Sequence, residues 1–337
     1  MPDAHRDEFE QIKGIIAGHG SFLVTGHVDP DGDCIGSMFA ICLYLRSLGK
    51  KVICFAPGDI SHRLLQLPGA DSLVTREEVE ATRFEVVFTV DSPTAGRIDN
   101  VLDPVSGKPV VNIDHHPGNE MFGTVNVVDE TAAAAAMIVM EMLTAIAPGS
   151  IDPDIASLLY LGILMDTGAF RFQNTGPEAL RAAGKLMEYG ARAYELTHEF
   201  IYMRKFRTLK LLSLVLDTLE VHSGGRIATM EITRSMLEKT GSEFSDSEGF
   251  VDYGAAIDDV ELVALFREIE PDRVRVSLRS RNHHDVAAIA ARFGGGGHSK
   301  AAGLTVESDL ATARGQVLES LAALYAGGEG TRDTDEE

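Results

Sequence analysis

Short apolar runs rich in β-branched residues recur through the first half of the chain, and each is followed by a helical pattern. The runs lie at 22–25, 52–55, 86–90 and 110–113. Strands and helices that alternate in this way are typical of a parallel sheet covered by helices. Ligands of such sheets lie beyond the carboxyl ends of the strands. The sequence therefore predicts an α/β fold and directs attention to the residues that follow each run.

Longer helical patterns complete the first half, and a new set of elements begins near residue 219. Helices are predicted at 131–146, 154–164, 177–189 and 204–219, the last as a connector. Strands are then predicted at 219–222, 226–231, 261–268 and 273–278, with helices at 285–293 and 309–325. We therefore expect a smaller α+β domain in the second half. The predicted parts are a first domain at 1–200, a connector helix and linker at 201–222, a second domain at 223–326 and a disordered acidic tail at 327–337.

Composition is that of a globular chain with room for two domains. Of its 337 residues, 45% are hydrophobic and 24% are charged, which argues against wholesale disorder. No apolar run reaches the roughly 20 residues of a membrane span, and the charged start of the chain is unlike a signal peptide. Cys34, Cys42 and Cys54 cannot all pair, so they are interpreted as reduced thiols. These features predict a cytoplasmic protein.

Charge restricts the classes of partner. With 51 acidic and 30 basic residues the net charge is −21, which opposes long-range attraction of duplex DNA. The segment 267–300 is locally basic, with seven basic and four acidic residues. Bound divalent cations would cancel several negative charges. Small anionic substrates therefore remain compatible with the composition.

Acidic and imidazole side chains stand where ligands of a parallel sheet are expected. The first apolar run is followed by His27, Asp31 and Asp33, the third by Asp91, the fourth by Asp114, His115 and His116, and the helix at 154–164 by Asp166. A buried carboxylate is costly unless it is paired or bound to a cation. A solvated turn with a helix cap would explain one Asp-rich loop, but not polar groups at the ends of four apolar elements. The pattern predicts a site for divalent metals.

In this order, the four motifs resemble those of the DHH phosphoesterase superfamily, which is named for the triplet that stands here at 114–116. The resemblance implies that one metal ion is held by His27, Asp31 and Asp91. It implies that a second ion is held by Asp33, Asp91, His115 and Asp166. Asp91 would then bridge the two ions, His116 would face the substrate phosphate, and Asp114 would orient its neighbours. The catalytic residues implied are Asp91, Asp114, His115 and His116.

The same resemblance implies a cofactor and a reaction. The family prefers manganese, which suits mixed imidazole and carboxylate ligands better than an all-oxygen magnesium cage would. We therefore expect two Mn²⁺ ions, with Mg²⁺ or Co²⁺ as alternatives. Two cations about 3.5–4 Å apart can clamp both ends of an in-line displacement at phosphorus. The implied reaction is hydrolysis of a phosphate ester by two-metal activation of a bridging water.

A second set of residues resembles the substrate domain associated with the DHH family. It comprises a Ser-Leu-Arg-Ser segment at 277–280 and a glycine run at 294–297 that precedes a histidine. Glycine lets backbone N–H groups approach an anion closely. The predicted substrate contacts are His116, Arg279, Ser280, Gly295, Gly296, Gly297 and His298. Strand alternation puts Arg273, Arg275 and Arg279 on one face; we predict a phosphate contact for Arg279 and a solvated face for the other two.

Together, the two resemblances cover nearly the whole chain and favour the bacterial nanoRNase and 3′-phosphoadenosine 5′-phosphate (pAp) phosphatase group. The implied activity converts RNA of about two to five nucleotides to mononucleotides, and pAp to AMP. The expected partners are these short RNAs and nucleotide bisphosphates, without duplex DNA or a membrane, and the resemblance suggests a homodimer. One alternative is a phosphodiesterase of c-di-AMP or its linear product. Another is a catalytically silent nucleotide-sensing or RNA-binding module.

One segment departs from the family pattern. Where the family usually has Ser-Thr-x-Glu at a helix start, this chain has four alanines at 133–136 and then Met137. The lost hydroxyls leave every predicted metal ligand in place. A different substrate preference is therefore left open.

Overall fold

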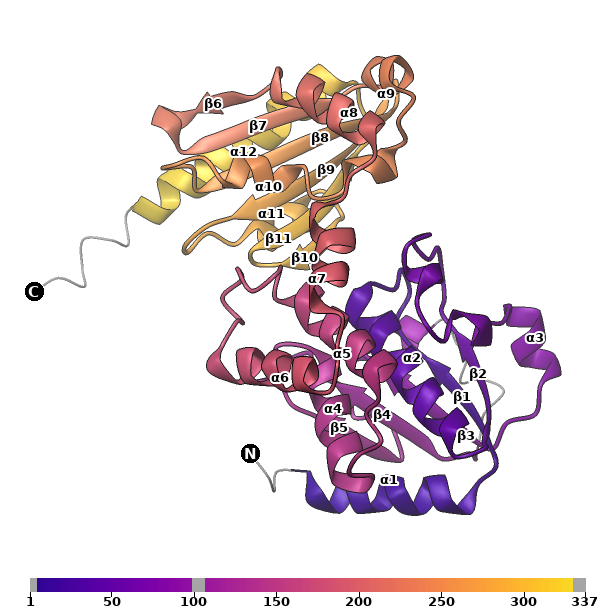
Figure 1. The fold of residues 1–337 in the computed structure, drawn as a ribbon. Helices are drawn as coiled ribbons and strands as arrows, with labels where there is room; N and C mark the ends of the chain where they lie inside the picture. The colour runs from indigo at the N-terminus through magenta and orange to yellow at the C-terminus, as the bar shows by residue number, and fades with distance from the viewer. Residues whose placement is uncertain (1–4, 99–106, 330–337) are drawn as a thin grey trace, which may run out of the picture. The chain divides into compact units, whose positions relative to one another are not determined.

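The chain forms two compact units in the computed structural model, which describes residues 5–98 and 107–329. The first unit spans Met1–Met203 and the second Arg204–Glu337. Each unit contains a β-sheet with its own helices (Figure 1). Among the described residues, no helix has the length and apolar character that crossing a bilayer requires. Of the predicted tail, residues 327–329 belong to the last helix, and 330–337 lie outside the described residues.

Five parallel strands form the sheet of the first unit, which confirms the predicted α/β fold. They are β1 (Ser21–Thr25), β2 (Lys51–Phe55), β3 (Val86–Val90), β4 (Val110–Asp114) and β5 (Val125–Val128). Their order in the sheet is β2-β1-β3-β4-β5 (Figure 1). Because β1, β3 and β4 are direct neighbours and parallel, their carboxyl ends meet at one edge of the sheet.

Helices cover both faces of this sheet. They are α1 (Arg6–Gly18), α2 (Gly32–Ser47), α3 (Arg76–Ala81), α4 (Ala135–Ile146), α5 (Pro153–Asp166), α6 (Pro177–Glu188) and α7 (Ala193–Leu196), with a π-helical turn at Thr197–Tyr202. Val24 and Phe88 are buried in one large core with α1, α2, α4 and α5. Leu23 and Val87 point to the opposite face and pack with Val79 of α3. The alternation follows the two-residue period of a strand.

Glycines allow α2 and α5 to pack closely. A Cβ atom on Gly36 would lie 2.5 Å from the carbonyl oxygen of Leu158, and one on Gly162 would lie 2.4 Å from Asp33 Oδ1. Both distances are far below van der Waals contact, so a side chain at either position requires the helices to separate. The close approach places the first turn of α2, which carries Asp33, beside the last turns of α5.

The sheet of the second unit is mixed. Its strands are β6 (Glu220–His222), β7 (Ile227–Ile232), β8 (Leu262–Glu270), β9 (Arg273–Ser280), β10 (Gly296–His298) and β11 (Ala301–Val306). They lie in the order β10-β11-β9-β8-β7-β6, with β7 and β8 parallel and the other pairs antiparallel. Its helices are α8 (Phe206–Leu216), α9 (Arg234–Thr240), α10 (Val251–Ala255), α11 (Val286–Arg292) and α12 (Leu310–Glu329).

Two cores lie on opposite faces of this second sheet. Val276 and Leu278 pack with α11 and α12 on one face. Val263 and Leu265 pack with α8, α9 and α10 on the other. The predicted connector helix corresponds to α8, and its Leu211 is buried in the second of these cores. The exposed positions of β9 therefore share a face with the core under α8, α9 and α10.

The packing of α2 on α5 generates a stability prediction. Gly36→Ala should lower the free energy of unfolding by about 1–3 kcal/mol, because the added methyl group overpacks the contact with Leu158. Gly14→Ala in α1 is the matched control, since no described residue outside this helix lies within 4 Å of a Cβ there. The control should be neutral or stabilising by up to about 1 kcal/mol. Urea unfolding followed by circular dichroism measures both, and equal stability of the two variants would contradict the close contact.

Candidate metal centre

Three predicted site residues converge at the carboxyl ends of neighbouring strands. His27 follows β1, Asp91 follows β3 and His115 follows β4. The backbone of Asp91 is left-handed, with φ of 54°, and its N–H donates to Ile113 O at 2.9 Å. Such a conformation is uncommon for a residue other than glycine and is often retained at functional sites. It directs the Asp91 carboxylate into the space between the two histidines.

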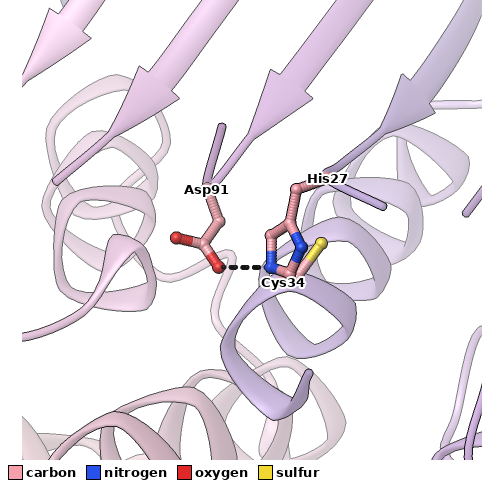
Figure 2. A group of neighbouring side chains, drawn as sticks. All are labelled: His27, Cys34 and Asp91. Carbon is pink, nitrogen blue, oxygen red and sulfur yellow. Dashed lines mark ion pairs between the residues drawn. The ribbon is translucent and has the colours of Figure 1, made fainter. Parts of the chain in front are cut away.

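The Asp91 carboxylate lies between two imidazoles. Its Oδ2 is 3.3 Å from His27 Nε2, and its Oδ1 is 3.3 Å from His115 Nε2. Figure 2 shows His27 and Asp91 facing each other beyond the ends of two strands. The Asp91 side chain is only 2% exposed. Burial of this kind is costly for a carboxylate unless positive charge lies close to it.

Backbone carbonyl groups orient both histidines. His27 Nδ1 lies 2.7 Å from Val28 O, and His115 Nδ1 lies 3.2 Å from Ala132 O. A carbonyl oxygen can only accept a hydrogen bond, so each Nδ1 carries the proton. Each Nε2 then faces Asp91 and is the nitrogen that can bind a cation. The fold thus presents the same ring atom of both histidines to one carboxylate.

Asp166 is brought to the same place by α5. It is the last residue of that helix, and its Oδ2 lies 3.2 Å from His115 Nε2. The close packing of α2 and α5 accounts for its position, since Gly32 of α2 faces the side chain of Met165. Asp166 is therefore held at the site by helix packing and not by the sheet.

Asp114 and His116 form a separate contact beside Asp91. Asp114 is fully buried, and its Oδ1 lies 2.8 Å from His116 Nδ1. Asn119 Nδ2 donates to the other carboxylate oxygen at 2.7 Å. His116 is thereby oriented through its Nδ1, with 23% of its side chain exposed. Asn119 was not identified from the sequence, because only the fold shows that its amide reaches Asp114.

Asp33 connects α2 to the start of α4. Its two carboxylate oxygens accept hydrogen bonds from the backbone N–H groups of Ala135 at 2.6 Å and Ala136 at 3.0 Å. The residue before this helix, Ala134, offers no side-chain cap. Asp33 therefore satisfies N–H groups that a helix start leaves unpaired. At this point the alanine segment 133–136 contributes backbone groups in place of side-chain hydroxyls.

In the structure, Asp31 caps a helix, whereas the sequence predicted it as a metal ligand. Its Oδ1 caps its own helix by accepting from the N–H groups of Asp33 at 3.0 Å and Cys34 at 3.1 Å. Among the described residues, it is not part of a group of ligand atoms that lie within 4.8 Å of one another. One oxygen of Asp31 thus serves the helix cap, and its role as a metal ligand stays a prediction.

Neighbouring charges shift the protonation of this cluster. Burial opposes a charge on His115, but Asp166 and Asp91 outweigh burial and raise the pKa of His115 to about 11. Burial also opposes a charge on Asp91, yet the imidazoles of His115 and His27 hold the pKa of Asp91 well below its usual range. Burial, with Asp166 and Asp91 nearby, raises the pKa of Asp33. A cation that binds here therefore has to displace protons.

The residues present fit a metal centre. Ligand atoms lie within 4.8 Å of one another in three groups: His27, Cys34 and Asp91; Asp91, His115 and His116; and Asp33, His115 and Asp166. Asp91 Oδ1 is buried and accepts no hydrogen bond from the described residues, although nitrogen atoms of His115 and His116 lie within 3.5 Å. A buried oxygen without a hydrogen bond suits cation binding. The imidazole and carboxylate donors suit a divalent metal.

Cys34 is the member of these groups that sequence reasoning missed. It lies in the first turn of α2, and Figure 2 shows it beside His27 and Asp91. The thiols were considered only for disulfide pairing, and all three are free and buried. Burial, with Asp91 and Asp31 nearby, raises the pKa of the Cys34 thiol well above its usual range. A neutral thiol is a weak metal ligand, so we assign Cys34 no role in binding.

The predicted substrate residues lie in the second unit. Arg279 Nε is 3.1 Å from Asp252 Oδ1, and Ser280 donates to His284 O at 2.6 Å. His298 is exposed on β10. A Cβ atom on Gly295 would lie 2.2 Å from Gly303 O, so the packing of the glycine segment on β11 requires that glycine. The substrate roles of these residues stay predictions.

Both units of the chain match known protein families. The chain matches the DHH family, N-terminal domain, over residues 21–163 and the DHHA1 domain over residues 225–326. It is 36% identical to the bifunctional oligoribonuclease and PAP phosphatase NrnA of Thermus thermophilus, with 90% of this chain and 89% of the relative covered. The chain belongs to the DHH family. A protein of the same name from Bacillus subtilis is 29% identical, with 87% of this chain and 91% of that protein covered.

A solved structure of a similar protein supports the architecture. An exopolyphosphatase-related protein from Bacteroides fragilis matches with a TM-score of 0.88. The two chains are 24% identical, and the match covers 95% of this chain and 96% of that chain. At this level of identity, the likeness supports the fold of this DHH chain and not its substrate.

Protonation of the cluster generates a prediction about metal binding. Titration with Mn²⁺ at pH 7 should release protons, because His115 is protonated below a pKa of about 11 and must lose its proton to bind a cation. Calorimetry in buffers of different ionisation enthalpy measures the number of protons. His115→Gln should lower that number, whereas His19→Gln, directly after α1, should not. Proton release that is equal in both variants would contradict the assignment of His115 as a ligand.

Proposed function

We propose that this protein is a metal-dependent phosphoesterase that hydrolyses very short oligoribonucleotides to mononucleotides and dephosphorylates pAp to AMP. The observation that carries the proposal is the position of Asp91, which is buried between the Nε2 atoms of His27 and His115 at the ends of three parallel strands. The names of the relatives from T. thermophilus and B. subtilis supply the two substrate classes. The charge of −21 favours such short substrates over duplex DNA.

The proposed division of the ligands follows the family resemblance. One ion would be held by His27, Asp31 and Asp91, and a second by Asp33, Asp91, His115 and Asp166. Asp91 is the shared ligand because its two oxygens approach different histidines. The mixture of imidazole and carboxylate donors favours Mn²⁺ over Mg²⁺. When bound, such ions supply Lewis-acid activation of a phosphate ester and of water.

The chain's own residues provide orientation around this centre. Asp114 holds His116 by its Nδ1, which leaves the other ring nitrogen of this partly exposed side chain for a substrate phosphate. Asn119 fixes Asp114 in turn. Asp33 binds the first N–H groups of α4, so the ligand carboxylate cannot rotate freely. These contacts keep the site in one geometry before a substrate arrives.

A turnover assay in Mn²⁺ tests the proposal. A dinucleotide RNA, a long RNA, pAp, c-di-AMP and pyrophosphate are offered to the same preparation. We expect turnover of the dinucleotide and pAp, and Asp91→Asn should lower both rates at least about 100-fold. Asparagine keeps the shape of the side chain and tolerates a positive φ, so the circular dichroism spectrum should not change.

The other outcomes of this assay each point to a different function. Preference for c-di-AMP would assign the centre to cyclic-dinucleotide hydrolysis. Binding of Mn²⁺ and nucleotides without turnover of any substrate would indicate a silent sensor. An active Asp91→Asn variant would contradict the shared-ligand assignment.

The second unit generates a prediction about substrate affinity. Arg279→Ala and His298→Ala should each raise KM for the dinucleotide about tenfold, because a charge-assisted contact to phosphate is lost. Affinity for Mn²⁺ should stay the same. Asp252→Asn is the control, since it removes only the carboxylate beside Arg279. If Asp252→Asn raises KM as much as Arg279→Ala does, the ion pair and not the phosphate contact is responsible.

A further inference from the structure

Arginines gather on one face of the second sheet. Arg273, Arg275 and Arg279 share this face of β9, and Arg267 of β8 stands directly opposite Arg275 in the register. Their neighbours Val274, Val276 and Leu278 point into the core on the other face. Like charges on opposite positions of paired strands are destabilising. We therefore expect negatively charged groups to lie close to these arginines.

Among the described residues, carboxylates pair with two of these arginines. Arg279 lies 3.1 Å from Asp252, and Arg273 lies 3.5 Å from Glu307. Arg267 instead contacts two hydroxyl groups, those of Ser247 at 3.0 Å and Ser277 at 2.7 Å. Arg275 has neither an ion pair nor a side-chain hydrogen bond in the part of the chain that the structure describes.

The neighbouring positive charges change the pKa of Arg267. Burial, together with the positive charges of Arg275 and Arg279, lowers the pKa of Arg267 to about 10, and Glu248 only partly opposes this. The local surface is thus positive in a chain whose net charge is −21.

A hollow of about 570 Å³ adjoins this face. It is lined by Arg273, Arg275, Thr305 and the backbone of the glycine segment. The fold requires glycine at three positions of that segment. Gly294 and Gly297 have φ of 73° and 139°, and Gly295 packs against β11. Gly296 has neither a positive φ nor an atom within 4 Å of a Cβ. Its lack of a side chain instead leaves room in the hollow for a ligand.

We propose that Arg275 binds a phosphate group of the oligonucleotide substrate, assisted by Arg267 and by the open backbone at Gly296. This phosphate group is not the one whose ester bond is hydrolysed. The inference rests on the proposed function and adds a subsite to it. Arginine, threonine and backbone N–H groups are the usual partners of nucleic-acid phosphates. Along β9, Arg275 and Arg279 are four residues apart, about 13 Å. The two positions can therefore contact different phosphates of one strand.

Binding without metal tests this subsite independently of turnover. Calorimetry in EDTA at low salt compares a 5′-phosphorylated trinucleotide RNA with AMP, each added to the protein of 337 residues. Arg275→Ala should weaken trinucleotide binding about tenfold and AMP binding less than about twofold. The slope of log affinity against log salt should fall by about 0.7 for the trinucleotide. Gly296→Ala should also weaken trinucleotide binding, because its methyl group enters the hollow.

Lys210→Ala in α8 is the control, since it removes one positive charge from an exposed position of the second unit that does not line the hollow. Trinucleotide affinity should therefore change by less than about twofold. Equal losses in Lys210→Ala and Arg275→Ala would reduce the effect to overall charge and overturn the inference. An equal loss for AMP and the trinucleotide would overturn it too.

Failure of the proposed function and failure of the proposed subsite give different experimental results. A protein that hydrolyses neither the dinucleotide nor pAp, yet shows the loss specific to Arg275→Ala, would keep the subsite and lose the activity. A wild-type protein that turns over pAp but binds no trinucleotide would keep the activity and lose the subsite.

Discussion

The burial of Asp91 is the constraint on which the rest of the first unit depends. A carboxylate removed from water is strongly destabilising unless positive charge replaces the lost hydration. The parallel sheet meets this requirement because β1 and β4 flank β3, so that His27 and His115 approach Asp91 from both sides. The same arrangement leaves one buried oxygen without a hydrogen bond from any residue that the structure describes. The feature that is costly for stability is the one that makes the site suitable for cations.

Asp33 ties this centre to the helices around it. It belongs to α2, binds the first N–H groups of α4 and lies against Gly162 of α5. Three helices therefore meet at one carboxylate, and their packing fixes its position. A helix start without a cap of its own would lose stability, so Asp33 serves the fold as well as the candidate site. Positioning by packed helices is more precise than positioning by a loop.

The sequence predicted the strands β1 to β4 and the convergence of His27, Asp91 and His115, because each follows an apolar run. It did not predict β5, which is only four residues long and half buried. Asn119 and Cys34 were also missed, since neither a single amide nor a single thiol has a sequence pattern that marks its spatial neighbours. For Arg275, strand alternation favoured a solvated face. The structure adds the hollow and the crowding by Arg267, which depend on pairing between strands far apart in the chain.

By itself, the sequence determined which residues follow the strands, because the periods of strands and helices are local properties of the chain. It thereby determined the available functional groups, which are imidazoles and carboxylates at strand ends and arginines on one face of β9. Only the tertiary structure decided which of these side chains contact one another. The order of the strands put Asp91 between two histidines, and the packing of glycines let α5 bring Asp166 to His115. Partners of this kind depend on distances through space, which sequence spacing does not fix.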